Sequence, residues 1–235
     1  MILSRGAFYT RIVFRCMFIL IPALLWTQTP RDGAPRDGAP RGGVFDHPLT
    51  GETRRRFTAV CEAMAEHRLM RGNFVQTKTL KRLNLSLVSQ GIFVVDAGQG
   101  IIWDTRSPYS SVMAVGRDFV VQSSAGRTTR LDTADNAAFV RISETMSAIF
   151  TGDIQKLTGN FKLFFTEEGK AWTLGLLPND AAIRSFARAI VINGDSALRT
   201  VILYEQNGDT VTYELSDHSY PSVLSSNEKA YFAVP

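Results

Sequence analysis

The chain has 235 residues, of which 45% are hydrophobic and 20% are charged, and its formal net charge is +4. The basic excess lies at the N-terminus. The chain has 26 basic and 22 acidic residues. Residues 1–30 contain three of the basic ones, and residues 31–43 contain three basic and two acidic ones. This leaves 20 basic and 20 acidic residues in 44–235. A neutral domain has no strong field for phosphates, so we expect no nucleic-acid partner.

The N-terminal segment has the pattern of an export signal. Arg5, Arg11 and Arg15 form a basic stretch, and an apolar run of 11 residues, Cys16–Trp26, follows it. A bilayer crossing needs about 20 apolar residues, so we predict a signal peptide over 1–30, with no small-x-small site to fix its cleavage point. No cysteine stands directly after the apolar run, and Cys16 lies at its beginning, which indicates an unlipidated product.

A linker and one domain are expected after the signal. Residues 31–43 are a Pro/Gly-rich repeat that offers nothing to bury, which predicts a solvated linker. Residues 44–235 are long enough for one domain with a large core. Cys61 is the one cysteine of that domain, and we interpret it as a small buried apolar residue.

The N-terminal half of the domain is predicted to be one helix followed by a meander of strands. A helix is expected from about 52 or 53 to 69, because Phe57, Val60, Cys61 and Met64 recur at three- and four-residue spacing. From Asn73 the period of the apolar residues changes to two. Strands are predicted at about 73–80, 85–95, 100–105, 110–115, 117–123 and 126–131.

The C-terminal half is predicted to hold a second helix and further strands. Residues 136–150 carry an apolar stripe at helical spacing, and Gly152 follows them. Phe161, Leu163 and Phe165 alternate as in a strand, and Asn207–Asp209 is a strong hairpin-turn signal. Further predictions are a strand partner with Trp172, Leu174 and Leu176 on one face, a helical turn at 178–184, a strand at 187–193, and a hairpin of 198–205 with 210–216.

These elements predict a mainly β domain with helices, of the α+β class. The count is about 10–11 strands and two main helices, without βαβ alternation. An antiparallel sheet of that size must curl or close. Its wide apolar face needs a cover, which the two amphipathic helices can supply.

The sequence offers no catalytic or metal-binding constellation. His47, His67 and His218 are its three histidines, and the usual nucleophile, phosphate-loop and zinc motifs are absent from the sequence. We therefore expect a protein that is not an enzyme, with no catalytic residues, no cofactor and no metal. The remaining enzymatic alternative is an esterase built around Ser196 and His218.

Large, adaptable apolar side chains are abundant, and we predict that they face inward. A packed core is the alternative for any one of them. As a set they suit a cavity that accepts acyl chains of varying shape, because Met and aromatic residues repack readily. The predicted lipid-binding residues of the cavity and lid are Phe74, Phe93, Trp103, Met113, Phe119, Phe139, Met146, Phe150, Phe161, Phe165, Trp172 and Leu174.

Several short motifs, in order, resemble the LolA family of periplasmic outer-membrane lipoprotein carriers. The resemblance covers about residues 54–216. Each motif is weak alone, and the order and spacing carry the likeness. The motifs are Arg71-Gly-Asn-Phe-Val-Gln76, Ser89-Gln-Gly-Ile-Phe93, Gly100-Ile-Ile-Trp-Asp-Thr-Arg-Ser-Pro108, Gly116-Arg-Asp-Phe-Val-Val-Gln122, the strand Ile190-Val-Ile192 and the Asn207-Gly208 hairpin.

The resemblance implies an unclosed β-barrel with an α-helical lid over a hydrophobic cavity. It implies a periplasmic monomer that takes acylated lipoproteins from an inner-membrane releasing transporter to an outer-membrane acceptor. Some members latch the lid with an arginine at the position that is Ala97 here. This departure leaves two alternatives open: a carrier of another acyl lipid linked to lipid biosynthesis, and a lipid-sensing regulatory module with a protein partner.

Overall fold

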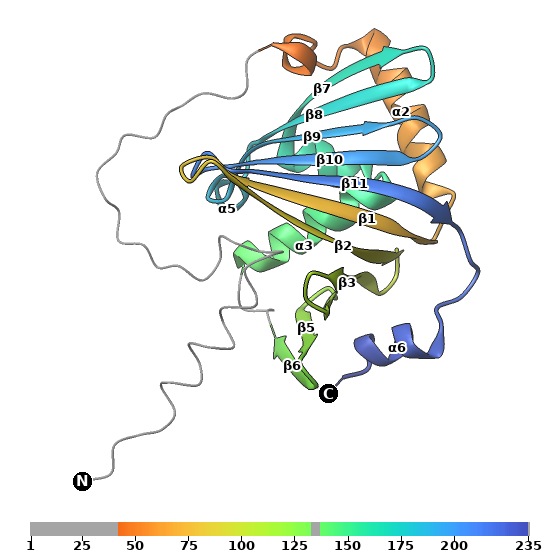
Figure 1. The fold of residues 1–235 in the computed structure, drawn as a ribbon. Helices are drawn as coiled ribbons and strands as arrows, with labels where there is room; N and C mark the ends of the chain where they lie inside the picture. The colour runs from red at the N-terminus through yellow and green to blue at the C-terminus, as the bar shows by residue number, and fades with distance from the viewer. Residues whose placement is uncertain (1–41, 133–136, 235) are drawn as a thin grey trace. The chain divides into compact units, whose positions relative to one another are not determined.

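The computed structural model describes residues 42–132 and 137–234, which lie in one unit of the chain, Gly38–Pro235 (Figure 1). The predicted signal peptide and nearly all of the predicted linker fall outside the described residues. The helices are the short 3-10 helix η2 (Gly43–Asp46), α2 (Gly51–Ala65), α3 (Ala137–Thr151), α4 (Ile154–Asn160), α5 (Ala181–Arg184) and α6 (Ser226–Phe232).

Eleven strands form a single antiparallel sheet in the order β6-β5-β4-β3-β2-β1-β11-β10-β9-β8-β7. The two outer strands, β6 and β7, end the sheet, so it is not closed. This confirms the predicted fold class. The strands are β1 (Leu69–Leu80), β2 (Leu85–Asp96), β3 (Gly100–Ser107), β4 (Ser111–Val115), β5 (Phe119–Ser124), β6 (Arg127–Asp132), β7 (Phe161–Glu168), β8 (Ala171–Pro178), β9 (Ala187–Gly194), β10 (Leu198–Glu205) and β11 (Thr210–Ser219).

Local sequence signals explain where the helices begin. Thr50 caps α2 in a capping box with Thr53, and Asp153 caps α4 by accepting the Lys156 amide. Helix α2 ends at Ala65, before the predicted end near residue 69. The reason is that Leu69 is already the first residue of β1, where its side chain is buried. Helices α4 and α6 were not predicted, although Ser225 and Glu228 form a capping-box pair that signals α6.

Strand register divides the sheet into an inner and an outer face. Phe93, Trp103 and Met113 are direct partners across β2, β3 and β4, so their side chains lie on one face, which we call the inner face. Helices α2 and α3 lie on this side of the sheet, behind the strands in Figure 1. Two apolar clusters cover the outer face. One comprises Leu69, Val94, Ile102, Ala114, Val121 and Leu224, packed against α6, and the other comprises Val44 of η2 with Phe164 and Val191.

Helix α6 is fastened to the outer face by a charged pair. Arg71 of β1 makes a bidentate contact with Glu228, whose carboxylate also accepts the Ser225 amide. The Arg71 hydrogen bond lowers the pKa of Glu228 from 4.5 to about 2. The Glu228 side chain is only 14% exposed, so solvent screens this contact less than a surface ion pair.

We expect this pair to make stability depend on pH. Because the pKa of Glu228 is depressed in the folded state, its contribution is full above about pH 4.5 and is lost as the pH falls toward about 2. Urea unfolding between about pH 6 and 2 should show a loss on the order of 1–3 kcal/mol that Glu228→Gln largely removes. The same pH dependence in both proteins would contradict this assignment.

Gly91 is expected to tolerate no side chain. A Cβ there would lie 1.9 Å from the Asp104 carbonyl oxygen, so Gly91→Ala should push β3 away from β2 and cost about 2–3 kcal/mol in urea unfolding. Gly159 in α4 is the matched control, because a Cβ there meets nothing within 4 Å. Gly159→Ala should be neutral or stabilise by up to about 1 kcal/mol. Equal effects of the two changes would refute the packing argument.

Candidate functional site

An aromatic cluster joins the inner face to helix α3. The Trp103 ring lies 4.8 Å from Phe74 and 5.9 Å from Phe93, measured between ring centroids. Phe150 of α3 reaches both Phe93, at 5.8 Å, and Trp103, at 6.2 Å. All four side chains are at least nine-tenths buried. This half of the inner face and α3 therefore form one continuous apolar contact.

A second apolar region lies under helix α2. Phe57 packs edge-on against Phe165 of β7 at 6.0 Å, and both are 1% exposed. Trp172 and Leu174 of β8 are buried beside them, and the Trp172 indole donates to the Asp195 carbonyl at 2.9 Å. Helix α2 contributes only Phe57 and Cys61 as buried residues, so it covers this region with few anchors.

Two small spaces lie among the described residues of the interior. A space of about 10 Å³ lies between α2, α3 and β7–β9, and one of about 30 Å³ lies between α2, Phe150 and Leu198. Binding sites for organic ligands measure roughly 300–1,000 Å³, so neither space holds an acyl chain as it stands. Either space would have to widen before it could hold an acyl chain.

An open groove runs along the outside of α2. It has a volume of about 430 Å³ and is bounded by α2, the β7–β8 turn and the β9–β10 turn. Met64 borders this groove and both interior spaces. Arg56 pairs with Glu167 at 3.1 Å across the groove, with the arginine side chain 66% exposed. Helix α2 is therefore the wall between the groove and the interior.

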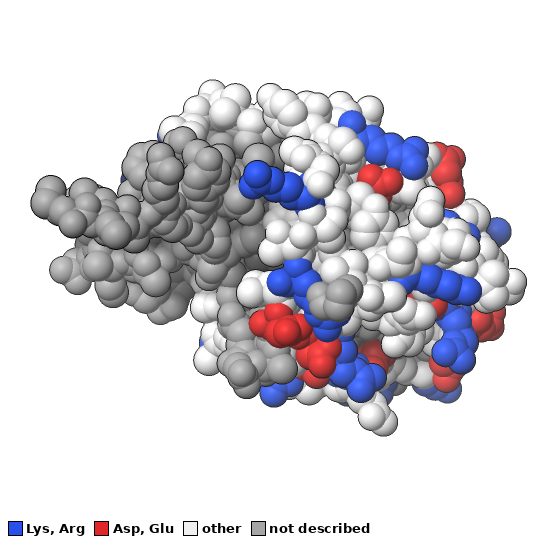
Figure 2. All heavy atoms as spheres, turned by 90° about the horizontal axis from the view of Figure 1, so that it is seen from below, with Lys and Arg blue, Asp and Glu red and all other residues white. Residues whose placement is uncertain are grey.

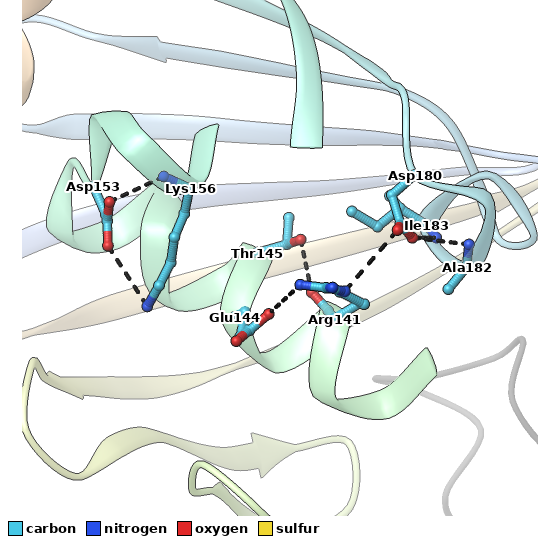
Figure 3. Close-up of polar contacts among 8 residues, drawn as sticks. All are labelled: Arg141, Glu144, Thr145, Asp153, Lys156, Asp180, Ala182 and Ile183. Atoms are coloured by element: carbon cyan, nitrogen blue, oxygen red, sulfur yellow. Dashed lines mark hydrogen bonds and ion pairs between the residues drawn. The ribbon is translucent and has the colours of Figure 1, made fainter. Parts of the chain in front are cut away.

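Polar contacts hold α3 at its N-terminal half (Figure 3). Arg141 pairs with Glu144 at 3.0 Å and approaches Asp180, the N-cap of α5, at 4.0 Å. The buried Ser143 hydroxyl donates to the Gly116 carbonyl at 2.9 Å. The family's latch position, Ala97, lies in the β2–β3 turn, where its amide donates to the Arg68 carbonyl. Arg141 and Ser143, which belong to α3 itself, therefore make the contacts described here, and Ala97 takes no part in them.

A polar band crosses the inner face next to the aromatic cluster. Lys78 pairs with Glu205 at 3.3 Å, with side chains only 8% and 6% exposed. Ser89 of β2, Gln76 of β1 and Tyr213 of β11 are successive cross-strand partners, which places them on the same face. Burial, and after it Glu205, raises the pKa of Tyr213 well above its usual range, so its hydroxyl stays protonated. The lining is therefore apolar with one polar strip.

His218 enters the interior because the backbone bends before it. Asp217 has φ +52°, and the His218 ring then meets the Phe93 ring edge-on at 5.8 Å. Burial and the nearby Arg199 lower the pKa of His218 below its ordinary value. The Ser196 hydroxyl contacts Asp195 at 3.3 Å, and no hydrogen bond joins Ser196 to His218 within the described chain. This geometry offers no assembled nucleophile and base.

The structure gathers nine of the twelve predicted lipid-binding residues in the helix-covered interior. Met146 is half-buried and lies one turn from Ile149 and Phe150 on α3. Phe139 belongs to α3, but its side chain lies outside the described residues. The nine are Phe74, Phe93, Trp103, Met113, Phe150, Phe161, Phe165, Trp172 and Leu174.

The prediction that Phe119 faces the interior was wrong. It packs with the outer-face cluster around Val121, and the Arg130 guanidinium lies 4.0 Å from its ring centroid. Phe119 shares a face with Val121 because the two are separated by one residue in β5, whereas Gln122 is the cross-strand partner of Met113. The strand begins at Phe119 rather than at 117, and aromatic character alone did not distinguish the two faces.

The list of predicted residues missed the α2 side of the interior and the whole polar band. Phe57, Cys61 and Met64 line the interior, and their helical spacing was the available signal. Burial raises the pKa of the Cys61 thiol to about 12, which fits the expected inert, buried cysteine. The members of the polar band resemble surface residues in sequence, so only the three-dimensional pairing identifies them.

The described surface carries charges of both signs and no cluster of metal ligands. On the face drawn in Figure 2, basic and acidic side chains are interspersed among uncharged ones. In residues 42–132 and 137–234 there is no group of three or more His, Cys, Asp or Glu arranged to hold a metal ion. No helix in those ranges is long and apolar enough to span a bilayer.

Comparisons with known proteins find one matching family and several similar solved structures. The family described as outer membrane lipoprotein carrier protein LolA matches residues 66–228. The comparison with curated proteins finds no match. Similar solved structures include a LolA superfamily protein from Nitrosomonas europaea, with 10% identity, a TM-score of 0.41 and coverage of 74% of this chain and 96% of that one. A putative outer membrane lipoprotein-sorting protein domain from Vibrio parahaemolyticus has 13% identity, a TM-score of 0.39 and coverage of 81% and 99%.

The buried Lys78–Glu205 pair should respond differently to single and double substitution. Lys78→Met leaves Glu205 charged and unpaired in the interior, which should cost about 3–5 kcal/mol in urea unfolding. Replacing both, Lys78→Met with Glu205→Leu, should restore stability close to or above that of the original protein. If the double variant is as unstable as the single one, the pair is not an isolated buried ion pair.

Proposed function

Because the chain belongs to the LolA family of outer membrane lipoprotein carrier proteins, we propose that it carries acylated lipoproteins from the inner to the outer membrane. The observation that carries the proposal is the apolar inner face under two displaceable helices. Eight large apolar residues lie on it, Phe150 of α3 packs against it, and two spaces of about 10 and 30 Å³ lie beside them. Such an interior has adaptable walls for a ligand.

Acyl-chain burial can supply the energy to open the interior. Each methylene transferred from water contributes about 0.8 kcal/mol, so a chain of about 16 carbons gains on the order of 10 kcal/mol before any cost. Opposing this are the contacts of Phe57 and Phe150 with the sheet and the Arg141–Asp180 contact at 4.0 Å. Ligand binding then selects the open arrangement, because the chain contacts the inner face only when a helix has moved.

We assign to helix α2 the movement that opens the interior. Its buried side chains are Phe57 and Cys61, whereas α3 buries Ser143, Thr145, Ala148, Ile149 and Phe150. The Arg56–Glu167 pair over the groove is exposed and contributes little. Displacement of Met64 would connect the outer groove with both interior spaces, and the cargo enters along that path.

The proposed carrier works in the periplasm as a monomer and is not an enzyme. Its partners are an acylated lipoprotein, an inner-membrane transporter that releases it and an outer-membrane acceptor. The basic and apolar pattern of residues 1–30 supports export. The Ser196 hydroxyl contacts Asp195, and no hydrogen bond to His218 occurs among the described residues, which supports a non-enzymatic role.

A carrier of another acyl lipid is the second candidate. Ala97 stands at the family's latch position, and the described contacts that hold α3 involve Arg141 and Ser143 instead. A lid that is attached differently is expected to change the size of cargo that the interior accepts. A lipoprotein must leave its protein part outside the interior, whereas a free lipid can be enclosed entirely. A lid that closes more completely therefore suits a free lipid.

Native mass spectrometry of the exported protein, before and after denaturing extraction, tests the proposal. A bound acylated lipopeptide supports lipoprotein carriage, and a bound lipid without peptide supports the second candidate. We expect Met146→Glu to reduce loading at least about tenfold while stability changes by about 1 kcal/mol, since Met146 is half-buried at the α3 surface.

The control for that variant is Leu131→Glu on the edge strand β6, where the side chain is 56% exposed. It should load like the original protein. Equal losses of loading and stability in Met146→Glu would make Met146 a core residue. An empty protein that also fails to keep an acylated lipoprotein soluble without detergent would refute both carrier functions.

A further inference from the structure

Exposed aliphatic side chains gather at the turn between β1 and β2. All eight residues from Lys81 to Val88 are exposed, and we call this segment the hairpin tip. Within it, Leu83 is 70% exposed, Leu85 and Leu87 are 48% exposed, and Val88 is 56% exposed. These are four of the eight large exposed apolar residues among those described. Scattered apolar residues are ordinary on a surface, but a concentration in six positions is not.

Strand pairing shows that the hairpin tip projects beyond its neighbours. On one side, β1 pairs with β11 only as far as Thr79. On the other, β2 pairs with β3 only from Gln90 onward. Leu85–Val88 therefore pair with β1 alone, and the Lys81 amide at the turn donates to Asp209 in the β10–β11 turn. The gold-coloured turn between β1 and β2 lies at the left-hand end of the sheet in Figure 1. Leu87 and Val88 point to opposite faces, so apolar groups cover both faces of the tip.

Two basic residues precede the apolar ones in the sequence of the hairpin tip. Lys81 and Arg82 lie in the turn itself, next to Leu83. Within the described ranges, no acidic side chain forms an ion pair with either of them. The Asp209 carboxylate accepts the Lys81 backbone amide at 3.0 Å, and Glu205 pairs with Lys78. The tip thus carries two basic side chains beside exposed leucines.

We propose that the hairpin tip docks this protein on the surface of an anionic lipid membrane. Leucine side chains at the end of a projection reach the boundary between headgroups and acyl chains, and basic side chains beside them contact anionic headgroups. The two attractions add at one small site. Without Lys81 and Arg82, residues 44–235 hold 18 basic and 20 acidic residues, so the rest of the domain adds no attraction to anionic lipid and the contact is shallow and reversible.

A protein partner fits the hairpin tip less well. A strand-adding partner would use the free edge of β2 at Leu85–Ser89, and it would leave Leu83 and the opposite side of the turn unused. A bilayer surface, in contrast, meets the turn end-on and engages Leu83, Lys81 and Arg82 together. The exposed residues on both faces and at the end of the hairpin therefore favour a membrane.

The test places a polarity-sensitive fluorophore on the hairpin tip of the full chain. Leu83→Cys is labelled in a Cys16→Ser background, because Cys61 is buried and its pKa of about 12 leaves it unreactive. The control is Leu131→Cys, 56% exposed on the edge strand β6. The vesicles are phosphatidylcholine with about 30 mol% phosphatidylglycerol, compared with phosphatidylcholine alone. The readout is access of an aqueous quencher to each label.

We expect anionic vesicles to reduce quencher access at position 83 by about half or more, with little change at position 131. The protection should weaken in about 0.5 M salt and in Lys81→Ala/Arg82→Ala. Equal protection of both positions, or none at position 83, would overturn the proposal. Protection of position 83 by host proteins without vesicles would assign the tip to a protein interface instead. These outcomes do not depend on whether the interior binds an acyl chain.

Discussion

The contact of Phe150 with Phe93 and Trp103 is the interaction on which the rest of the structure depends. An eleven-stranded sheet that does not close leaves one face wider than its own side chains can cover. Two aromatic rings at the centre of that face meet one ring from α3, at centroid distances of 5.8 and 6.2 Å. This fixes α3 over the middle of the sheet, and α2 then covers the remaining side through Phe57 and Phe165. The same apolar surface that stabilises the empty fold is the surface offered to a ligand.

The inner face also carries a cost that a purely apolar lining would avoid. Lys78 and Glu205 are buried as a pair, and Gln76, Ser89 and Thr105 are buried near them. Buried charges seldom improve stability over well-packed apolar residues. A polar strip beside an aromatic cluster instead gives the interior two ends of different character. The distinction matters for an amphiphilic cargo, whose polar and apolar parts prefer different surroundings.

The sequence predicted the sheet well because the meander alternates strongly and its turns carry glycine or Asn-Gly signals. Strand boundaries from Leu85 onward differ from expectation by one or two residues at most positions, and α3 begins and ends within a residue of its prediction. Helices α4 and α6 were missed because each has only seven residues, too few to show a period. Phe119 was placed on the wrong face because aromatic character does not show which face of β5 a side chain occupies. The polar band and the exposed hairpin depend on pairing between distant strands, which local pattern does not report.

The free edges of the sheet give it a mechanical property that a closed barrel lacks. Strands β6 and β7 are the two ends of the order and share no ladder of hydrogen bonds. The sheet can therefore uncurl and widen by small changes of twist at each of its ten strand pairs, without breaking a backbone hydrogen bond. Its capacity is set by bending stiffness rather than by a fixed circumference. Cargoes of different girth would then differ in binding energy gradually, and a sharp size limit would not be expected.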